Sequence, residues 1–237
     1  MTDLSDLRVR LDQMTERILS RLKDRSRFPG NPAVYEPDGV PVEGRSGISL
    51  LDFALEGLEI YHASLGRFSY PDQYRLTAAE VHTSPVRRTV AAVRDPDVTI
   101  QLRDNLLTYY RELVRRLSPT GEDPETYGET AYVDADLLNL LNERINVGRQ
   151  VAKSKAVSNP SLGDIVNDGD ALTALLRDEA REQRLLETVE ATATRYVLDP
   201  AIARGVFRWI IDETLALEVA YLQRLAAAGE LGSLTGR

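Results

Sequence analysis

Apolar residues recur every three or four positions through long stretches of this sequence, and this spacing constrains the fold more than any other feature. The alternation of apolar and polar residues that is typical of a half-buried β-strand is nearly absent. A helix turns once every 3.6 residues, so each stretch predicts an amphipathic helix with one buried stripe. The sequence therefore predicts an all-α fold, built as one large helical bundle.

The predicted helices form two groups, separated by the turn-forming residues 119–124. The first group spans residues 4–25, about 48–62 and about 98–117, and residues 67–97 are interrupted by Pro71, Pro85 and Pro96. The second group spans roughly 130–157, 170–198 and 200–228, with a short element near 162–166. We expect a single domain over residues 1–237, with an N-terminal half that ends at about residue 118.

The composition excludes several classes of function. The 237 residues contain no Cys, which removes thiol catalysis and Cys-based zinc sites and fits a reducing cytoplasm, and two His residues leave little for another metal site. A net charge of -8 disfavours nucleic acid and anionic membranes as partners, because both present phosphate. The first residues are charged and no run approaches the roughly 20 apolar residues of a membrane span. We expect a soluble, cytoplasmic protein.

Charged side chains occupy helix positions that should be apolar. Over 130–157 the stripe includes Leu141, Arg144, Gly148 and Lys155, so Arg144 and Lys155 point the same way. They lie 11 residues apart (155 − 144), roughly 16 Å along the axis, and Gly148 leaves room between them. Three other helices add polar groups to their own apolar stripes: Arg8, Asp178, Glu182, Thr214 and Glu218.

Two interpretations of these charges remain open at this point. Burying an unpaired charge costs several kcal/mol, so such groups either pair with one another or surround a polar ligand. For any single residue, a boundary salt bridge or a snorkelling side chain is the commoner explanation. Their occurrence on four helices favours a ligand site in the bundle interior.

Three segments of the chain resemble the all-helical chorismate mutases, in the eukaryotic-type form of fungi and plants. They are LRVRLDQMTERILSRLKDRSRFPGNPAVYEPDG from residue 7, SLLDFALEGLEIYHASLGRFSYPDQ from residue 49, and DLLNLLNERINVGRQVAKSKA from residue 136. The most specific pattern is RI-x-x-G-x-x-V-A-x-x-K, from Arg144 to Lys155. The resemblance covers nearly the whole chain. It implies an isomerase that rearranges chorismate to prephenate in the shikimate pathway, for Phe and Tyr biosynthesis, without a cofactor or metal.

The resemblance also implies a role for most of the charged positions. Arg8 and Arg144 would bind the two substrate carboxylates, with Thr214 assisting one of them. Lys155 would donate to the ether oxygen whose carbon bond breaks, and Glu218 would approach that oxygen from the other side. The helices of about 130–228 would then be the catalytic ones.

Two further sets of positions depart from the fungal pattern. Glu182 and Asp178 would hold the ring hydroxyl, although Asp178 stands where fungal relatives have Asn. Fungal and plant members bind aromatic amino acids at a dimer-interface site built partly from paired Arg residues and a Gly-Ser segment. Here those positions read Gly66-Arg67 and Gly128-Glu129. We therefore expect a homodimer in which Arg67 and Gly128 mark a vestigial effector site, with weak or absent allosteric control.

Two alternatives stay open. The substrate could be 4-amino-4-deoxychorismate or a related compound of specialised metabolism, because an amine would also suit Glu182 and Asp178. The chain could also be a non-catalytic helical partner protein, although such a protein would have no physical reason to keep these charges buried. His62 lies on an apolar stripe and is assigned no catalytic role, since a hydrogen-bonded core imidazole explains it.

Overall fold

The computed structural model describes residues 4–69, 73–80, 102–159 and 161–232 of the chain. In these ranges the regular structure is helical, apart from one isolated bridge between Val42 and Arg45. The elements in chain order are α1 (Leu4–Arg25), η1 (Pro32–Tyr35), α2 (Leu50–Ser64), η2 (Arg67–Ser69), α3 (Arg103–Leu117), η3 (Pro124–Thr126), α4 (Tyr127–Asn146), α5 (Gly148–Ser158), α6 (Leu162–Ile165), α7 (Gly169–Leu176), α8 (Glu179–Arg195) and α9 (Pro200–Ala227). The predicted all-α fold is confirmed.

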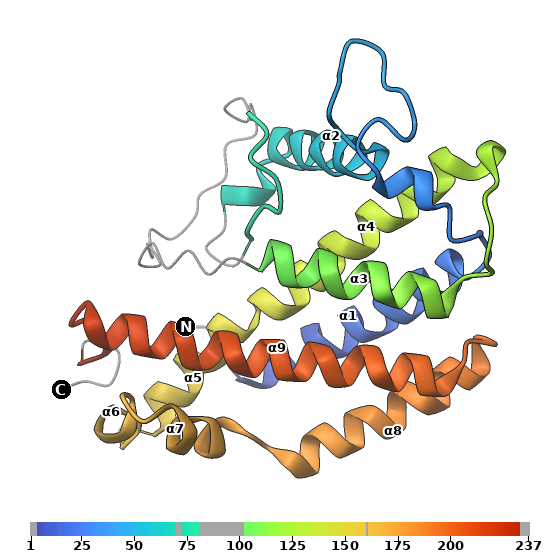
Figure 1. Ribbon diagram of the computed structural model, residues 1–237. Coiled ribbons are helices and arrows are strands. Elements are labelled where there is room, and N and C mark those ends of the chain that lie inside the picture. Colours follow the sequence, from blue (N-terminus) through green and yellow to red (C-terminus); the bar gives the residue numbers. More distant parts are fainter. Residues whose placement is uncertain (1–3, 70–72, 81–101, 160, 233–237) are drawn as a thin grey trace.

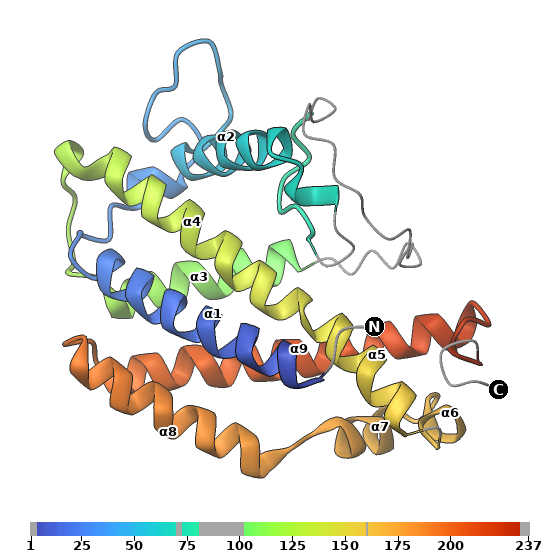
Figure 2. The ribbon, with the colours of Figure 1, turned by 180° about the vertical axis from the view of Figure 1, so that it is seen from behind.

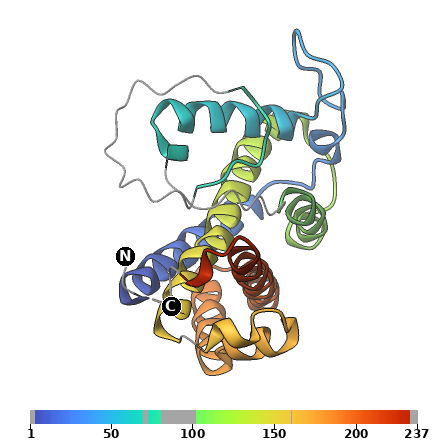
Figure 3. The same ribbon diagram turned by 90° about the vertical axis from the view of Figure 1, so that its left-hand side faces the viewer.

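Helices α4 and α5 follow one another as a diagonal rod through the molecule, and the other helices pack around it (Figure 1). Helix α1 lies along α4, while α9 contacts α4, α5, α7 and α8 (Figure 2). An end view separates α2 at one side from α1, α5, α8 and α9 at the other (Figure 3). Helices α1, α8 and α9 therefore lie together at the end of the rod that α5 forms (Figure 3).

Two helix boundaries differ from the sequence prediction. The helix expected over 130–157 is interrupted once, at Val147, whose φ of -58° and ψ of -24° stay helical, so the rod continues in the same direction. The helix expected over 170–198 is two helices, because Arg177 is extended and Asp178 begins α8 as its N-cap. Asp is among the preferred N-cap residues, and here that preference overrides the apolar periodicity. The starts expected near residue 98 and the breaks at Pro71, Pro85 and Pro96 lie outside the described residues.

The apolar stripes of the helices meet in one large core and a smaller one. The large core joins α1, α2, α3, α4, α8 and α9. The smaller core joins α5, α6, α7 and α9. A third cluster, Leu7, Leu11, Met14 and Val147, packs α1 against the junction of α4 and α5. No helix in the part of the chain that the structure describes is long and apolar enough to cross a membrane.

A buried charge cluster ties the N-terminal half to the central rod. The side chains of Arg25 and Asp134 are fully buried, with Arg25 Nε 2.6 Å from Asp134 Oδ1. Tyr35 and Tyr110 donate their hydroxyls to the two oxygens of Asp134, at 2.5 and 2.6 Å. Arg25 in turn donates to the Tyr35 hydroxyl at 3.1 Å. Arg25 Nε meets Asp134 as an ion pair without a hydrogen bond, while the hydroxyls and the carboxylate of the cluster are hydrogen-bonded, as a buried ion pair requires.

Tyr35→Phe tests this cluster. The substitution removes one donor to Asp134 and one acceptor of Arg25, and hydrogen bonds to charged groups contribute about 2 kcal/mol. We expect the free energy of unfolding to fall by that amount and the melting temperature to fall by several degrees. Tyr132→Phe is the matched control, because this residue is 58% exposed on α4. Equal melting temperatures for the two variants would contradict the prediction.

Candidate active site

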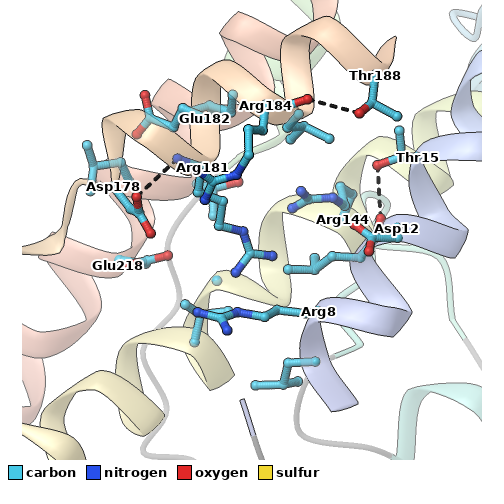
Figure 4. Close-up of a pocket in the computed structure, with 18 of the residues that line it drawn as sticks. Arg8, Asp12, Thr15, Arg144, Asp178, Arg181, Glu182, Arg184, Thr188 and Glu218 are labelled. Atoms are coloured by element: carbon cyan, nitrogen blue, oxygen red, sulfur yellow. Dashed lines mark hydrogen bonds between the residues drawn. The ribbon is translucent and has the colours of Figure 1, made fainter. Parts of the chain in front are cut away.

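A cleft of about 640 Å³ lies between α1, the α4–α5 rod, α8 and α9 (Figure 4). The structure brings to this cleft all the residues for which the sequence predicted a catalytic or substrate-binding role. They are Arg8, Arg144, Lys155, Asp178, Glu182, Thr214 and Glu218. Positions from five helices and one N-cap thus converge, although they span more than 200 residues of sequence.

Lys155 and Glu218 form an ion pair on one wall of the cleft. Lys155 Nζ donates to Glu218 Oε2 at 2.9 Å and to the carbonyl oxygen of Leu176 at 2.7 Å. Leu176 is the last residue of α7, and carbonyls at a helix C-terminus have no partner within the helix. The ammonium group is therefore held from two sides, with its third proton available to a ligand.

Glu218 is almost completely enclosed, with a side-chain exposure of 6%. Burial raises the pKa of its carboxyl above the ordinary range for Glu. Lys155, Arg144 and Arg181 oppose this by stabilising the carboxylate, but the net direction is upward. The carboxyl therefore keeps its proton to higher pH than an exposed Glu does.

Arg144 is a buried cation that lacks a full set of partners. Its residue exposure is 6%, and its Nε has no hydrogen-bond partner among the described residues. Burial, and then the nearby Arg181, lower its pKa to about 10, while Asp12 and Glu218 act in the opposite direction. A buried guanidinium with an unsatisfied donor is unfavourable in the free protein, and an anionic ligand would satisfy it.

Arg181 is a site residue that the sequence analysis missed. Its guanidinium extends from α8 into the same space as those of Arg8 and Arg144 (Figure 4). Burial lowers its pKa, and the closeness of Arg8 lowers it further. The available signal was its spacing, three residues after the capping Asp178 and next to Glu182. Three cations that repel one another, from three different helices, indicate a site for a ligand with more than one negative charge.

Gly148 has a different role from the one predicted. It lines the cleft, but a Cβ at this position would lie 2.8 Å from Thr214 Cγ2 and 3.5 Å from Glu218 Cγ. The space above Gly148 is thus filled by α9 rather than left for a ligand. Its missing side chain lets α9 pack against α5, which sets the positions of Thr214 and Glu218. Thr214 Oγ1 donates to the carbonyl of Ile210 at 2.7 Å.

Asp178 and Glu182 lie at the start of α8, at the far side of the cleft from Arg144. Asp178 Oδ1 accepts the backbone N–H of Arg181 at 3.1 Å, so one of its oxygens is engaged in capping the helix. The carboxylate of Glu182 has a side-chain exposure of 14%. Both groups are hydrogen-bond acceptors and suit a ligand with a hydroxyl or amine at this end.

Known proteins resemble this chain in both sequence and fold. The family model for chorismate mutase type II matches residues 126–219, from the start of α4 into α9. The chorismate mutase of Saccharomyces cerevisiae is 27% identical over 94% of this chain and 94% of its own length. The chloroplastic chorismate mutase 1 of Arabidopsis thaliana is 28% identical over 81% of this chain and 58% of its own length.

Solved structures extend the match to the whole fold. The chorismate mutase of Candida albicans, solved in complex with L-Trp, superimposes with a TM-score of 0.87 at 25% identity, over 94% of this chain and 91% of that one. A second structure, with tyrosine bound in its allosteric site, gives a TM-score of 0.80 at 27% identity, over 93% of this chain and 95% of that one. This chain is a homologue of the fungal and plant chorismate mutases over most of its length.

This homology confirms the resemblance to fungal and plant chorismate mutases that is seen in the sequence. The family model spans every predicted cleft residue except Arg8, which lies on α1.

The two residues predicted to mark a vestigial effector site lie outside the cleft. Arg67 Nη2 is 3.0 Å from Glu143 Oε2, and the other oxygen of Glu143 is 3.1 Å from Arg10. Gly128 lies in the first turn of α4, 15 residues before Glu143 (143 − 128), roughly 22 Å along the helix. Within one chain Arg67 and Gly128 are therefore apart. A site shared between two chorismate mutase subunits stays a prediction.

Proposed function

We propose that this chain catalyses the rearrangement of chorismate to prephenate in the cleft between α1, α5, α8 and α9, within the biosynthesis of Phe and Tyr. The observation that carries the proposal is the cluster of Arg8, Arg144 and Arg181, which lines the same cleft as the Lys155–Glu218 pair. Chorismate carries two carboxylates and an ether oxygen, so its charge distribution matches this arrangement.

The reaction needs no nucleophile, metal or redox group. One carbon–oxygen bond breaks while one carbon–carbon bond forms, in a single cyclic step within the substrate. The enzyme's part is to hold the flexible substrate in the compact conformer that reacts. Arg8 and Arg144 bind one carboxylate each, because a planar guanidinium group can donate two parallel hydrogen bonds to a carboxylate. Arg181 reinforces the carboxylate sites from α8, and Thr214 assists one of them.

Negative charge grows on the ether oxygen as its bond to carbon lengthens. Lys155 donates a hydrogen bond from its ammonium group to that oxygen. The hydrogen bonds to Leu176 and Glu218 already hold the ammonium group in place before the reaction. Glu218 donates from the other side in its protonated form, since an ionised carboxylate has no hydrogen to give. Glu182 and Asp178 accept the hydrogen bond of the ring hydroxyl.

The direct test follows the absorbance of chorismate after addition of the purified protein, with and without tyrosine and tryptophan. We expect stoichiometric formation of prephenate. Because Arg67 is paired with Glu143, we also expect little response to either amino acid. A folded protein that leaves chorismate unchanged would overturn the proposal. It would favour the aminated substrate first and a non-catalytic partner protein second.

The protonation of Glu218 predicts the pH dependence. Its raised pKa means that the donating form is present below that pKa and is lost as the pH rises through it. We expect kcat/KM to fall at alkaline pH, and the midpoint of this fall to report the pKa of Glu218 in the free enzyme. Glu218→Gln keeps an N–H donor at every pH and should flatten this limb. Matching profiles for wild type and Glu218→Gln would contradict the assignment.

We also propose a homodimer. Helix α2 exposes an apolar stripe in which Phe53, Ile60 and Tyr61 are 42%, 43% and 59% exposed, with Gly57 between them. A contiguous exposed apolar face of this kind is typical of a surface that a partner covers. The relevant measurement is the mass of the purified protein by sedimentation. The mass of one chain would contradict the dimer.

We also propose that the chain forms a single domain. The large core mixes side chains of α1–α3 with those of α4, α8 and α9, which supports one domain rather than two. We propose a cytoplasmic location, which fits the absence of Cys and the net charge of -8. Several relatives carry the description chloroplastic, and that location is theirs.

A further inference from the structure

Glu182 stands between two arginines that do not themselves line the cleft. Its Oε1 lies 3.7 Å from Arg177 Nε, and its Oε2 lies 3.6 Å from Arg208 Nη1. Arg177 comes from the extended link between α7 and α8, and Arg208 comes from α9. Among the described residues that line the cleft, neither arginine appears, so both act from behind the carboxylate.

The two distances have a chemical consequence. Both exceed the length of a hydrogen bond, so the oxygens of Glu182 keep their lone pairs for a donor on the ligand. Both are short enough for strong charge interaction, since two unit charges at about 4 Å interact appreciably even near a protein surface. Glu182 therefore offers the ligand two good acceptors while most of its negative charge is already compensated.

The other carboxylates near Glu182 add little negative charge to this part of the cleft. Asp178 is engaged at the N-terminus of α8, where the partial positive charge of the helix end offsets it. Asp212 lies 2.8 Å from Arg177 and has a side-chain exposure of 52%, so it sits on the outer side of that arginine. Arg208 has no other carboxylate partner in the described part of the chain. Arg208 is therefore the cation whose charge acts most directly on Glu182.

We propose that Arg208 and Arg177 are specificity-determining residues, which make the Glu182 subsite select a neutral hydroxyl over an ammonium group on the substrate ring. This inference rests on the proposed function and narrows its substrate. A hydroxyl donates to Glu182 without bringing charge. An ammonium would also donate, but it would place a third cation beside two guanidinium groups, and like charges brought together at a binding site are strongly unfavourable.

The experiment compares kcat/KM for chorismate and for 4-amino-4-deoxychorismate in four proteins. They are the wild type, Arg208→Gln, Arg208→Lys and Arg204→Gln. Arg204 is the matched control, because it lies one turn earlier on α9 and pairs with Glu190 at 3.0 Å, away from the cleft lining. The readout is the ratio of the two kcat/KM values, in which a general loss of folded enzyme cancels.

We expect the wild type to favour chorismate. Arg208→Gln should move the ratio toward the aminated substrate by about tenfold, whereas Arg208→Lys, which keeps the charge, and Arg204→Gln should each stay within about twofold of the wild type. An unchanged ratio in Arg208→Gln, or a wild type that favours the aminated substrate, would overturn the inference while leaving the chorismate mutase activity intact. A folded wild type that converts neither substrate would overturn the proposed function, and the inference with it.

Discussion

Replacing Lys155 with alanine is expected to lower kcat by about 10³-fold, while KM changes much less. The ether oxygen carries little charge in bound chorismate and gains charge only as its bond breaks, so the ammonium group stabilises the transition state more than the substrate. Removing one such preorganised donor typically costs 10²- to 10³-fold in kcat. Here the loss lies at the upper end of that range, because the variant also leaves Glu218 buried without its ion pair.

The control for this prediction is another lysine of the chain. Lys23 is exposed near the C-terminal end of α1, and Lys23→Ala removes the same charge without touching the cleft. We expect its kcat to match that of the wild type. The measurement is the initial rate of chorismate loss at saturating and at low substrate. A Lys155→Ala enzyme within a few fold of the wild-type kcat would exclude Lys155 from the chemical step.

Sequence periodicity located Arg144 and Lys155 correctly because both lie on one continuous stripe. The single-residue break at Val147 stays helical, so the eleven-residue spacing still points both side chains into the cleft. The same reasoning brought Asp178 to the cleft but missed the helix break before it, where Asp178 caps α8. A carboxylate one turn before Glu182 fits a helical stripe and a helix cap equally well, and only the packing of α7 against α9 decides between them.

Other features could not be established from periodicity alone. Arg181 has helical spacing to Asp178, but the spacing does not show that its guanidinium shares the cleft with those of Arg8 and Arg144. Glu59 is fully buried on α2, where it accepts the backbone N–H groups of Leu76 and Thr77. A buried carboxylate that binds backbone of a distant segment leaves no mark in the spacing of apolar residues. The bracketing of Glu182 by Arg177 and Arg208 likewise depends on three segments meeting in space.

Replacing Arg144 is expected to have the second large effect on activity, and its effect on stability should be different. Arg144→Ala should lower kcat/KM by about 10²- to 10³-fold, since removing one partner of a buried charge pair costs 2 to 5 kcal/mol. Much of this loss should appear in KM, because a substrate carboxylate is charged before and during the reaction. Arg115→Ala is the control, with a side chain that is 76% exposed on α3, and it should leave the rate unchanged.

The stability of the free protein should not fall with the activity when Arg144 is replaced by an apolar side chain. The lowered pKa of Arg144, about 10, means that the folded chain accommodates the charged guanidinium less well than the unfolded chain does. Replacing a poorly compensated buried charge by an apolar side chain of similar volume is often neutral or stabilising. We therefore expect Arg144→Met to lose activity as Arg144→Ala does, but to melt at the wild-type temperature or above it. A lower melting temperature together with a normal rate would show that Arg144 maintains the fold, and it would remove the main support for a dianion site between α1, α4 and α8.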